Sequence, residues 1–357
     1  MDKKAIALLA NDIHASKENL SEFRLNWEEM LTVDEDYGVK DILIGGDLFT
    51  TRASQSLDVL LAVHDALVKA ALSYDITVAN GNHDKVDQKN DRGYCHIFYD
   101  IKRVYIVDDV EVINYGNPKE SSNISVTMIG YYPENDGFLE KLNKAEELAQ
   151  EMQGKHFLYI HQGINGALRT PSDSDLSPNV FGPVWDKVFV GHYHDRCVIE
   201  GTNIEYIGAS RQHNYGEDDQ KGYTILFSDG STEFVQNKVN TRYVTVEANY
   251  EQVMSDDFRS CLEGASNSNV KIKLKVSCDP SQITSINREE LSAFGVAKIE
   301  INQPSANTTS ETQRGLVERY DKSGLIESYK NYCTENKVQD VDFGVGYLNK
   351  INMYVVG

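Results

Sequence analysis

The chain has 357 residues, of which 40% are hydrophobic, so it can form one large domain with an appendage or two domains. Its formal net charge of −20 argues against a protein that binds nucleic acid nonspecifically through a broad basic surface. The five cysteines lack the spacing of a zinc site or a disulfide framework, and no apolar run approaches the ~18 residues of a membrane span. We therefore expect a reduced, cytoplasmic protein without a membrane segment.

The first half of the chain predicts strands that alternate with helices. Strands are expected at 5–10, 41–44 and 75–79, and helices at 17–37 and 54–72. The same pattern predicts a further helix at 137–153 and four more strands, at 104–107, 124–131, 157–160 and 188–190. Such alternation is typical of an α/β sheet, which places its functional residues after the carboxyl ends of strands.

The second half of the chain changes character near residue 240. Before it, segments 204–207, 223–227 and 232–235 predict antiparallel strands joined by turns. After it, a small β-α-β-α-β unit is expected, with strands at 243–246, 270–276 and 296–301 and helices at 256–262 and 288–294. Polar residues 302–310 predict a linker, and apolar residues then recur at helical spacing. The expected divisions are 1–240, 241–301, 302–310 and 311–357.

Five short fragments place polar side chains directly after apolar runs. They are Asp12-Ile13-His14, Gly46-Asp47, Gly81-Asn82-His83-Asp84, His161-Gln162-Gly163 and Gly191-His192-Tyr193-His194. Each alone predicts no more than ordinary polar side chains. Together, their carboxylate, amide and imidazole donors suit a pair of Mn²⁺, Fe²⁺ or Zn²⁺ ions rather than a sulfur-bound zinc. Two ions about 3.5–4 Å apart assist in-line attack on phosphorus, so the sequence predicts a metal-dependent phosphoesterase.

The ordered set of fragments resembles the calcineurin-like metallophosphoesterases. Within them it resembles the nuclease branch, which includes the nuclease subunit of the bacterial SbcCD complex and the recombination endonuclease small subunit of T-even-like phages. The likeness continues through residues 204–208 and 221–223. It implies an α/β fold, a metallophosphoesterase β-sandwich flanked by helices. A small α+β capping domain at 241–301 would orient DNA, and a helical tail at 311–357 would bind an SMC-like ATPase subunit (SbcC-like). A homodimer formed through helices of the catalytic domain is also implied.

The resemblance also assigns roles to the fragment residues. Seven side chains are expected to hold two divalent ions, with Mn²⁺ ahead of Mg²⁺, Fe²⁺ or Zn²⁺: Asp12, His14, Asp47, Asn82, His161, His192 and His194. Asp47 is expected to bridge both ions. His83 is not needed as a ligand and is the candidate general acid that protonates the leaving oxygen. Asp84 is expected to orient His83.

Substrate contacts are expected from two loops. Thr50 stands where the resembled cellular nucleases commonly carry a histidine that helps to hold the scissile phosphate. Arg52 is either a phosphate contact or an ordinary surface arginine. Arg211, His213 and Tyr215 follow a Gly-Ala-Ser segment, where they form either DNA contacts, with Tyr215 stacking on a base, or a solvated loop.

The expected function is a Mn-dependent DNA nuclease subunit of an ATPase–nuclease complex, phage-encoded, in DNA recombination, repair or replication. Hydroxide held by two ions would attack the phosphodiester. One alternative is a phosphomonoesterase or nucleotide phosphodiesterase for a small substrate, which the net charge of −20 fits at least as well. A third hypothesis, a non-catalytic scaffold, would be expected to lack some of the seven ligands, and all seven are present.

Overall fold

The structure is a computed structural model that describes residues 3–133, 137–168, 170, 172, 174–266 and 269–302, with isolated positions at 326, 329, 330, 333, 334, 341 and 345. The predicted linker at 302–310 and tail at 311–357 thus lie outside the described residues, apart from Asn302 and those positions. Two compact units divide the chain, one formed by 1–275 with 287–300 and the other by 276–286 with 301–357. Within the described part, no helix is both long and apolar enough to cross a bilayer.

The first sheet has six strands in the order β12-β11-β1-β2-β3-β4. Its parallel strands are β1 (Ala5–Ala10), β2 (Asp41–Ile44), β3 (Asp75–Ala79) and β4 (Val104–Val107). A hairpin of β11 (Gly222–Phe227) and β12 (Thr232–Gln236) pairs antiparallel with β1. The carboxyl ends of β1, β2 and β3 therefore meet at one edge.

The second sheet also has six strands, in the order β5-β6-β7-β8-β10-β9. They are β5 (Val110–Asn114), β6 (Ile124–Ile129), β7 (Lys155–His161), β8 (Lys187–Gly191), β9 (Cys197–Val198) and β10 (Ile204–Tyr206). The sequence predicts β10 as an antiparallel neighbour of β11, but β10 pairs parallel with β8 in this sheet. Ile204 and Tyr206 are buried in the apolar layer that includes α3, which explains the different pairing.

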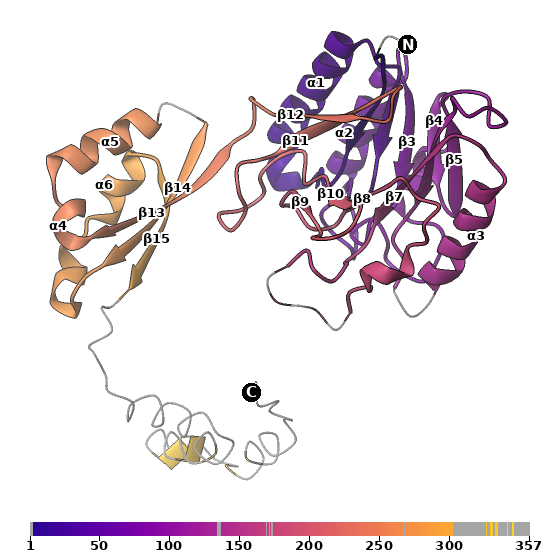
Figure 1. The fold of residues 1–357 in the computed structure, drawn as a ribbon. Coiled ribbons are helices and arrows are strands. Elements are labelled where there is room, and N and C mark those ends of the chain that lie inside the picture. The colour runs from indigo at the N-terminus through magenta and orange to yellow at the C-terminus, as the bar shows by residue number, and fades with distance from the viewer. Residues whose placement is uncertain are drawn as a thin grey trace. The chain divides into compact units, whose positions relative to one another are not determined.

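Helices cover the outer faces of the two sheets (Figure 1). Helices α1 (Leu20–Tyr37) and α2 (Leu57–Ala70) pack on the first sheet, and α3 (Leu139–Gln150) packs on the second. Between the sheets lies an apolar layer to which both contribute, including Leu9 and Leu43 from the first and Phe157 and Phe189 from the second. The predicted α/β class is confirmed, and the structure shows that its two large sheets are mixed and flanked by helices.

A separate three-stranded sheet follows, in the order β13-β14-β15. It contains β13 (Arg242–Asn249), β14 (Val270–Ser277) and β15 (Val296–Asn302), with helices α4 (Tyr250–Val253), α5 (Asp256–Ser266) and α6 (Arg288–Ala293). In β14, Ile272, Leu274 and Val276 are buried and alternate with lysines, the period of two expected for a strand with one covered face. The predicted strands and helices of this region are confirmed.

Candidate metal centre

Five strand ends deliver the predicted ligands to one place. Asp12, Asp47 and Asn82 follow β1, β2 and β3 by two or three residues, while His161 ends β7 and His192 follows β8 directly. Because parallel strands present their carboxyl ends at the same edge, ligands far apart in the sequence meet there. Both sheets contribute ligands from the carboxyl ends of their strands, so the candidate metal centre lies where these two sheet edges meet.

The backbone at this centre adopts uncommon conformations. Outside glycine, the described residues contain five positive φ angles, and four belong to predicted ligands: Asp12 at 51°, His14 at 51°, Asp47 at 52° and His192 at 98°. Left-handed backbone of this kind costs about 1–3 kcal/mol per residue and persists only where surrounding contacts fix it. Such clustering at the predicted ligands points to a functional requirement.

Asp12, His14, Asp47 and His194 form the first donor set. The Nε2 atoms of His14 and His194 lie 3.2 Å apart. His14 Nε2 lies 3.5 Å from Asp47 Oδ2 and 3.9 Å from Asp12 Oδ1, and His194 Nε2 lies 3.8 Å from Asp12 Oδ1. Atoms that each lie 2.0–2.2 Å from one ion are about 3–4 Å from one another, so these four donors fit one divalent ion.

Asp47, Asn82, His161 and His192 form the second donor set. Asn82 Oδ1 lies 3.2 Å from His161 Nε2 and 3.0 Å from His192 Nδ1. The same end of the Asn82 amide lies 3.3 Å from Asp47 Oδ2, which in turn is 3.3 Å from His161 Nε2. Asp47 Oδ2 therefore borders both sets, as a bridging ligand must.

Titration behaviour fits cation binding. Burial lowers the pKa of His14 and of His192 to about 3, so both rings are neutral and offer a lone pair. Burial also acts on His161, but Asp47 and Asp12 outweigh it and raise the pKa of His161 to about 9. For Asp47, burial is outweighed by the neighbouring imidazoles, led by His161, and its pKa falls well below the usual range. The carboxylates that hold a proton on His161 equally favour a metal cation.

The surroundings of one oxygen, Asp12 Oδ1, indicate whether these residues suit a metal ion. Asp12 Oδ1 is buried without a hydrogen-bond partner among the described residues, and burial raises the pKa of Asp12. It lies 3.8–4.0 Å from the Nε2 atoms of His14, His161 and His194, too far for hydrogen bonds. A buried carboxylate oxygen facing three imidazoles at this distance is suited to a shared cation, so the residues fit a metal centre.

His83 borders the first donor set. Its ring centroid lies 5.0 Å from that of His14, and its backbone N–H donates to Asp47 Oδ1 at 2.8 Å. The ring nitrogen Nδ1 is hydrogen-bonded to the Thr50 carbonyl. A carbonyl only accepts, so Nδ1 carries the hydrogen and Nε2 is the atom left for a substrate.

Asp84 has a task different from the one predicted. Rather than orienting His83, its buried carboxylate accepts hydrogen bonds from the N–H groups of Gly81 (2.7 Å), Phe49 (2.9 Å) and Leu48 (3.2 Å). Burial, and then the charge of Asp47, raise the pKa of Asp84 to about 7. Asp84 thus ties the loop after β3 to the loop after β2.

A cavity of about 510 Å³ opens over the ligands, and its lining includes Thr50, Arg52 and His83. Arg52 is exposed and supplies a positive charge to the cavity. The Thr50 hydroxyl donates to the His14 carbonyl at 2.8 Å, so Thr50 supports the ligand loop as well as lining the cavity.

The other three predicted DNA contacts, Arg211, His213 and Tyr215, are engaged within the protein. Arg211 is 2% exposed, and its side chain donates to the carbonyls of Ile13 and His14, so it is not free to contact DNA as expected. The Tyr215 ring is partly buried and packs edge-on against Tyr243, with 5.1 Å between centroids.

Sequence reasoning missed Glu217 altogether and misjudged His213. Glu217 Oε1 lies 2.8 Å from His194 Nδ1, and His213 Nε2 lies 2.7 Å from the Asp12 carbonyl oxygen. No spacing rule marks a glutamate 23 residues after its histidine partner, because the link exists only through the tertiary fold.

No protein-family model matches the chain, and no curated protein matches it either. Chains of solved structures do match, among them that of Pseudomonas putida nuclease MPE, at a TM-score of 0.26 and 15% sequence identity. The match covers 55% of this chain and 64% of that chain, so this chain spans less than two thirds of that nuclease. A TM-score of this size identifies neither the fold nor the function, and the candidate function rests on the two donor sets.

Proposed function

We propose that the chain is a divalent-metal-dependent phosphodiesterase that cleaves DNA, with Mn²⁺ as the preferred ion. The observation that carries the proposal is the pair of donor sets that share Asp47 Oδ2, 3.5 Å from His14 Nε2 and 3.3 Å from His161 Nε2. Two bound ions supply Lewis acidity toward phosphoryl oxygens and make water a stronger nucleophile near neutral pH.

The remaining chemistry belongs to residues that line the cavity. In the proposed reaction, His83 holds a proton at Nε2 and transfers it to the leaving oxygen, while the Thr50 carbonyl fixes its ring through Nδ1. Arg52 binds a non-bridging phosphate oxygen. No side-chain nucleophile is needed, because attack by water cleaves the ester directly.

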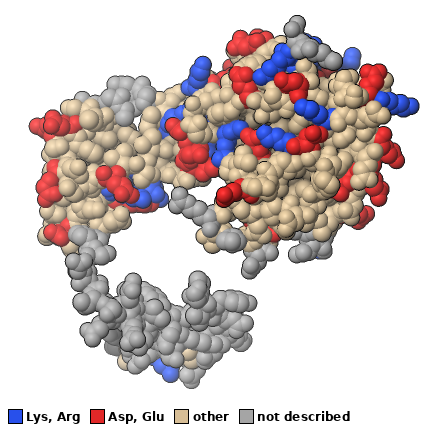
Figure 2. Space-filling model, in the orientation of Figure 1, with Lys and Arg blue, Asp and Glu red and all other residues tan. Residues whose placement is uncertain are grey.

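The surface charge bears on the choice of substrate. On the face drawn in Figure 2, Lys and Arg side chains are interspersed with Asp and Glu. Tight nonspecific binding of a polyanion requires several cations along one track. We therefore propose that DNA cleavage by the isolated chain has a high KM, and that a partner subunit supplies much of the DNA affinity.

The direct test uses the purified full-length chain, Mn²⁺, and end-labelled single-stranded and linear duplex DNA. We expect metal-dependent cleavage that Asp47→Ala abolishes and that Asp229→Ala, in the exposed turn between β11 and β12, leaves unchanged. Cleavage that survives Asp47→Ala would refute the proposed active site.

The net charge of −20 favours a second candidate, a phosphomonoesterase or a phosphodiesterase for a small nucleotide. The same donor sets serve these reactions. Rapid turnover of p-nitrophenyl phosphate or a cyclic nucleotide, with DNA left intact, would select this candidate. Faster hydrolysis of bis-p-nitrophenyl phosphate than of the monoester, together with DNA cleavage, would reject it.

We also propose that the chain is the nuclease subunit of an ATPase–nuclease complex in DNA recombination, repair or replication. In this proposal residues 241–301 cap the DNA site and residues 311–357 bind an SMC-like ATPase. The support is the sequence resemblance and the apolar helical spacing of a segment behind a polar one. Deleting 311–357 should abolish co-purification with the ATPase while leaving hydrolysis of bis-p-nitrophenyl phosphate intact; retained co-purification would refute the assignment.

A homodimer is part of the same proposal, and α2 offers a surface for it. Leu57, Leu61 and Val68 fall on one stripe of this helix and are 67%, 50% and 40% exposed. A two-fold axis would pair the stripe with itself. Light scattering should report a dimer that Leu57→Glu with Leu61→Glu makes monomeric and that Val198→Glu, on β9, does not. A monomeric unmodified chain would refute this surface.

A further inference from the structure

The first donor set depends on backbone segment 12–14, whose conformation is fixed by hydrogen bonds from other parts of the chain. Asp12 and His14 both have φ of 51°, with only Ile13 between them. Their N–H groups donate to the carbonyls of Gly46 (3.0 Å) and Asp47 (2.9 Å), which fixes one side of the segment. The opposite side, three consecutive carbonyls, needs partners from elsewhere.

Those partners come from residues 211–217, which we call the brace. Arg211 donates from Nε to the Ile13 carbonyl and from Nη2 to the His14 carbonyl, both at 3.2 Å. His213 Nε2 donates to the Asp12 carbonyl at 2.7 Å. The brace therefore holds all three carbonyls from some 200 residues later in the chain, and the His14 carbonyl accepts further hydrogen bonds from Asn19 and Thr50.

Glu217 links this brace to the other histidine of the first donor set. Its Oε1 accepts from His194 Nδ1 at 2.8 Å and from Asn214 Nδ2 at 2.6 Å, and its Oε2 accepts from the backbone N–H of His213 at 2.9 Å. A carboxylate accepts Nδ1–H, which leaves the Nε2 lone pair of His194 for an ion. One side chain thus fixes a ligand and the loop that positions two others.

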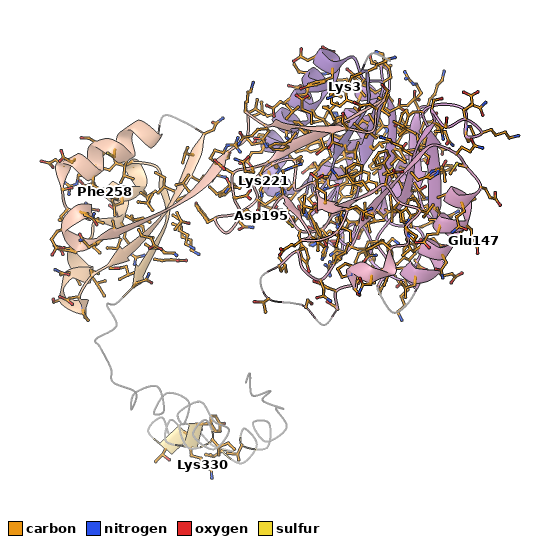
Figure 3. All side chains as sticks on the ribbon, viewed as in Figure 1. Lys3, Glu147, Asp195, Lys221, Phe258 and Lys330 are labelled. Atoms are coloured by element: carbon orange, nitrogen blue, oxygen red, sulfur yellow. The ribbon has the colours of Figure 1, made fainter. Side chains whose placement is uncertain are left out.

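The neighbouring packing agrees with this role. The His213 ring packs against the rings of both His14 and His194, with 4.8 Å between centroids in each case, and those two rings are 5.0 Å apart. Buried Lys221 donates to the His194 carbonyl at 2.8 Å and pairs with Asp195, which lies beside it in Figure 3. The first donor set is therefore held from several sides.

The second donor set has a separate support. His161 Nδ1 lies 3.1 Å from the Gly45 carbonyl oxygen, which fixes that ring without any residue of the brace. A change at Glu217 should therefore affect one set of donors more than the other.

We propose that Glu217 is a positioning residue for the first of the two ions, acting through the His194 ring and the brace. This inference rests on the proposed two-metal function and deepens it. Removing an outer-shell partner of this kind typically lowers metal affinity 10–100-fold. The loss should be confined to the ion held by Asp12, His14 and His194.

The test is calorimetric titration of Mn²⁺ into the metal-free full-length chain and its variants. We expect two ions in the unmodified chain, and a 10–100-fold weaker affinity for one of them in Glu217→Ala. Glu217→Gln keeps a hydrogen-bond acceptor for His194 and should recover part of the loss. If Glu217→Ala does not fold, the prediction is tested with Glu217→Gln, which should show a smaller loss of affinity for the same ion. Glu146→Ala is the control, since the carboxylate of Glu146, on α3, also accepts hydrogen bonds from a loop, at Gly182 and Trp185, but has no hydrogen bond or ion pair with the brace in the part of the chain that the structure describes.

The outcomes separate this inference from the proposed function. Two unchanged affinities in folded Glu217→Ala would overturn the positioning role and leave the proposed function standing. An equal loss at both ions, with a lower thermal midpoint, would show a general structural role and would also overturn it. A selective loss in a chain that hydrolyses no phosphodiester would support the positioning role while refuting the proposed function.

Discussion

Gly81→Ala tests the donor geometry without removing any ligand. A Cβ at this position would lie 2.1 Å from Asp47 Oδ1 and 2.3 Å from the Asp47 backbone nitrogen. Ordinary contact begins at 3.4 Å, so the Asp47 carboxylate would have to move by about 1.3 Å. A misplacement of about 1 Å at a catalytic centre costs on the order of 100-fold in rate. We therefore expect about a 100-fold loss in kcat/KM and weaker binding of both ions, because Asp47 belongs to both sets.

The assay is hydrolysis of bis-p-nitrophenyl phosphate over a range of Mn²⁺ concentrations, with a thermal melt of the metal-free chain. Gly116→Ala is the control, because the three atoms nearest to its Cβ would all belong to Asn123, at 3.2 Å or more. Because the added Cβ also meets the backbone nitrogen of Asp47, overpacking at Gly81 should cost at least about 1–3 kcal/mol of unfolding free energy, and activities are compared at a temperature where the melt shows the variant to be folded. Activity within threefold of the unmodified chain at every Mn²⁺ concentration would refute the assignment of Asp47 as the shared ligand.

Three further predictions concern protons and phosphate. His83→Asn should lower kcat by 10²–10⁴-fold without changing Mn²⁺ affinity, because it removes a general acid but no ligand. Arg52→Ala should lower kcat/KM for DNA about tenfold with kcat for an aryl phosphodiester nearly unchanged, because an exposed charge acts on binding. Mn²⁺ binding at pH 7 should release at least one proton: the pKa of His161 is raised to about 9, so it must lose a proton to become a ligand, and the pKa of His194 is also raised, since its burial is outweighed by Glu217 and Asp12, while His14 and His192 are already neutral. Affinity should therefore fall at least about tenfold for each pH unit below 9, as measured by calorimetry in buffers of different ionisation enthalpy.

Each of these predictions has a contrary result. An unchanged kcat in His83→Asn would remove His83 from the proton-transfer role. A loss of Mn²⁺ affinity in Arg52→Ala would show that Arg52 supports the centre rather than the substrate. An affinity independent of pH between 7 and 9 would mean that His161 is not a ligand.

Much of the fold follows from local sequence patterns. The strands that lead to Asp12, Asp47 and Asn82 are short apolar runs bounded by polar or glycine residues, and the structure has them where the pattern predicts. The pairing of β10 with β8 was not predictable in this way, because register and partner depend on which face Ile204 and Tyr206 bury. Strand β9 has two residues, too few for any periodicity.

The candidate site shows the same division. Ligands at strand ends follow from residue type and order, since the sheet itself brings them together. Their supports do not: Glu217 reaches His194 from 23 residues away, and Arg211 reaches Ile13 from 198 residues away. Asp12 and His14 adopt left-handed backbone although neither is glycine, the residue type that usually indicates such backbone in a sequence. The local sequence therefore could not predict the brace.

The most direct test of the central claim is the anomalous scattering of manganese in crystals of the full-length chain grown with Mn²⁺. The two donor sets predict two peaks about 3.5–4 Å apart, one beside His14 and His194, the other beside Asn82 and His161, with Asp47 between them. An absence of peaks at these residues, or a single ion bound elsewhere, would contradict the account.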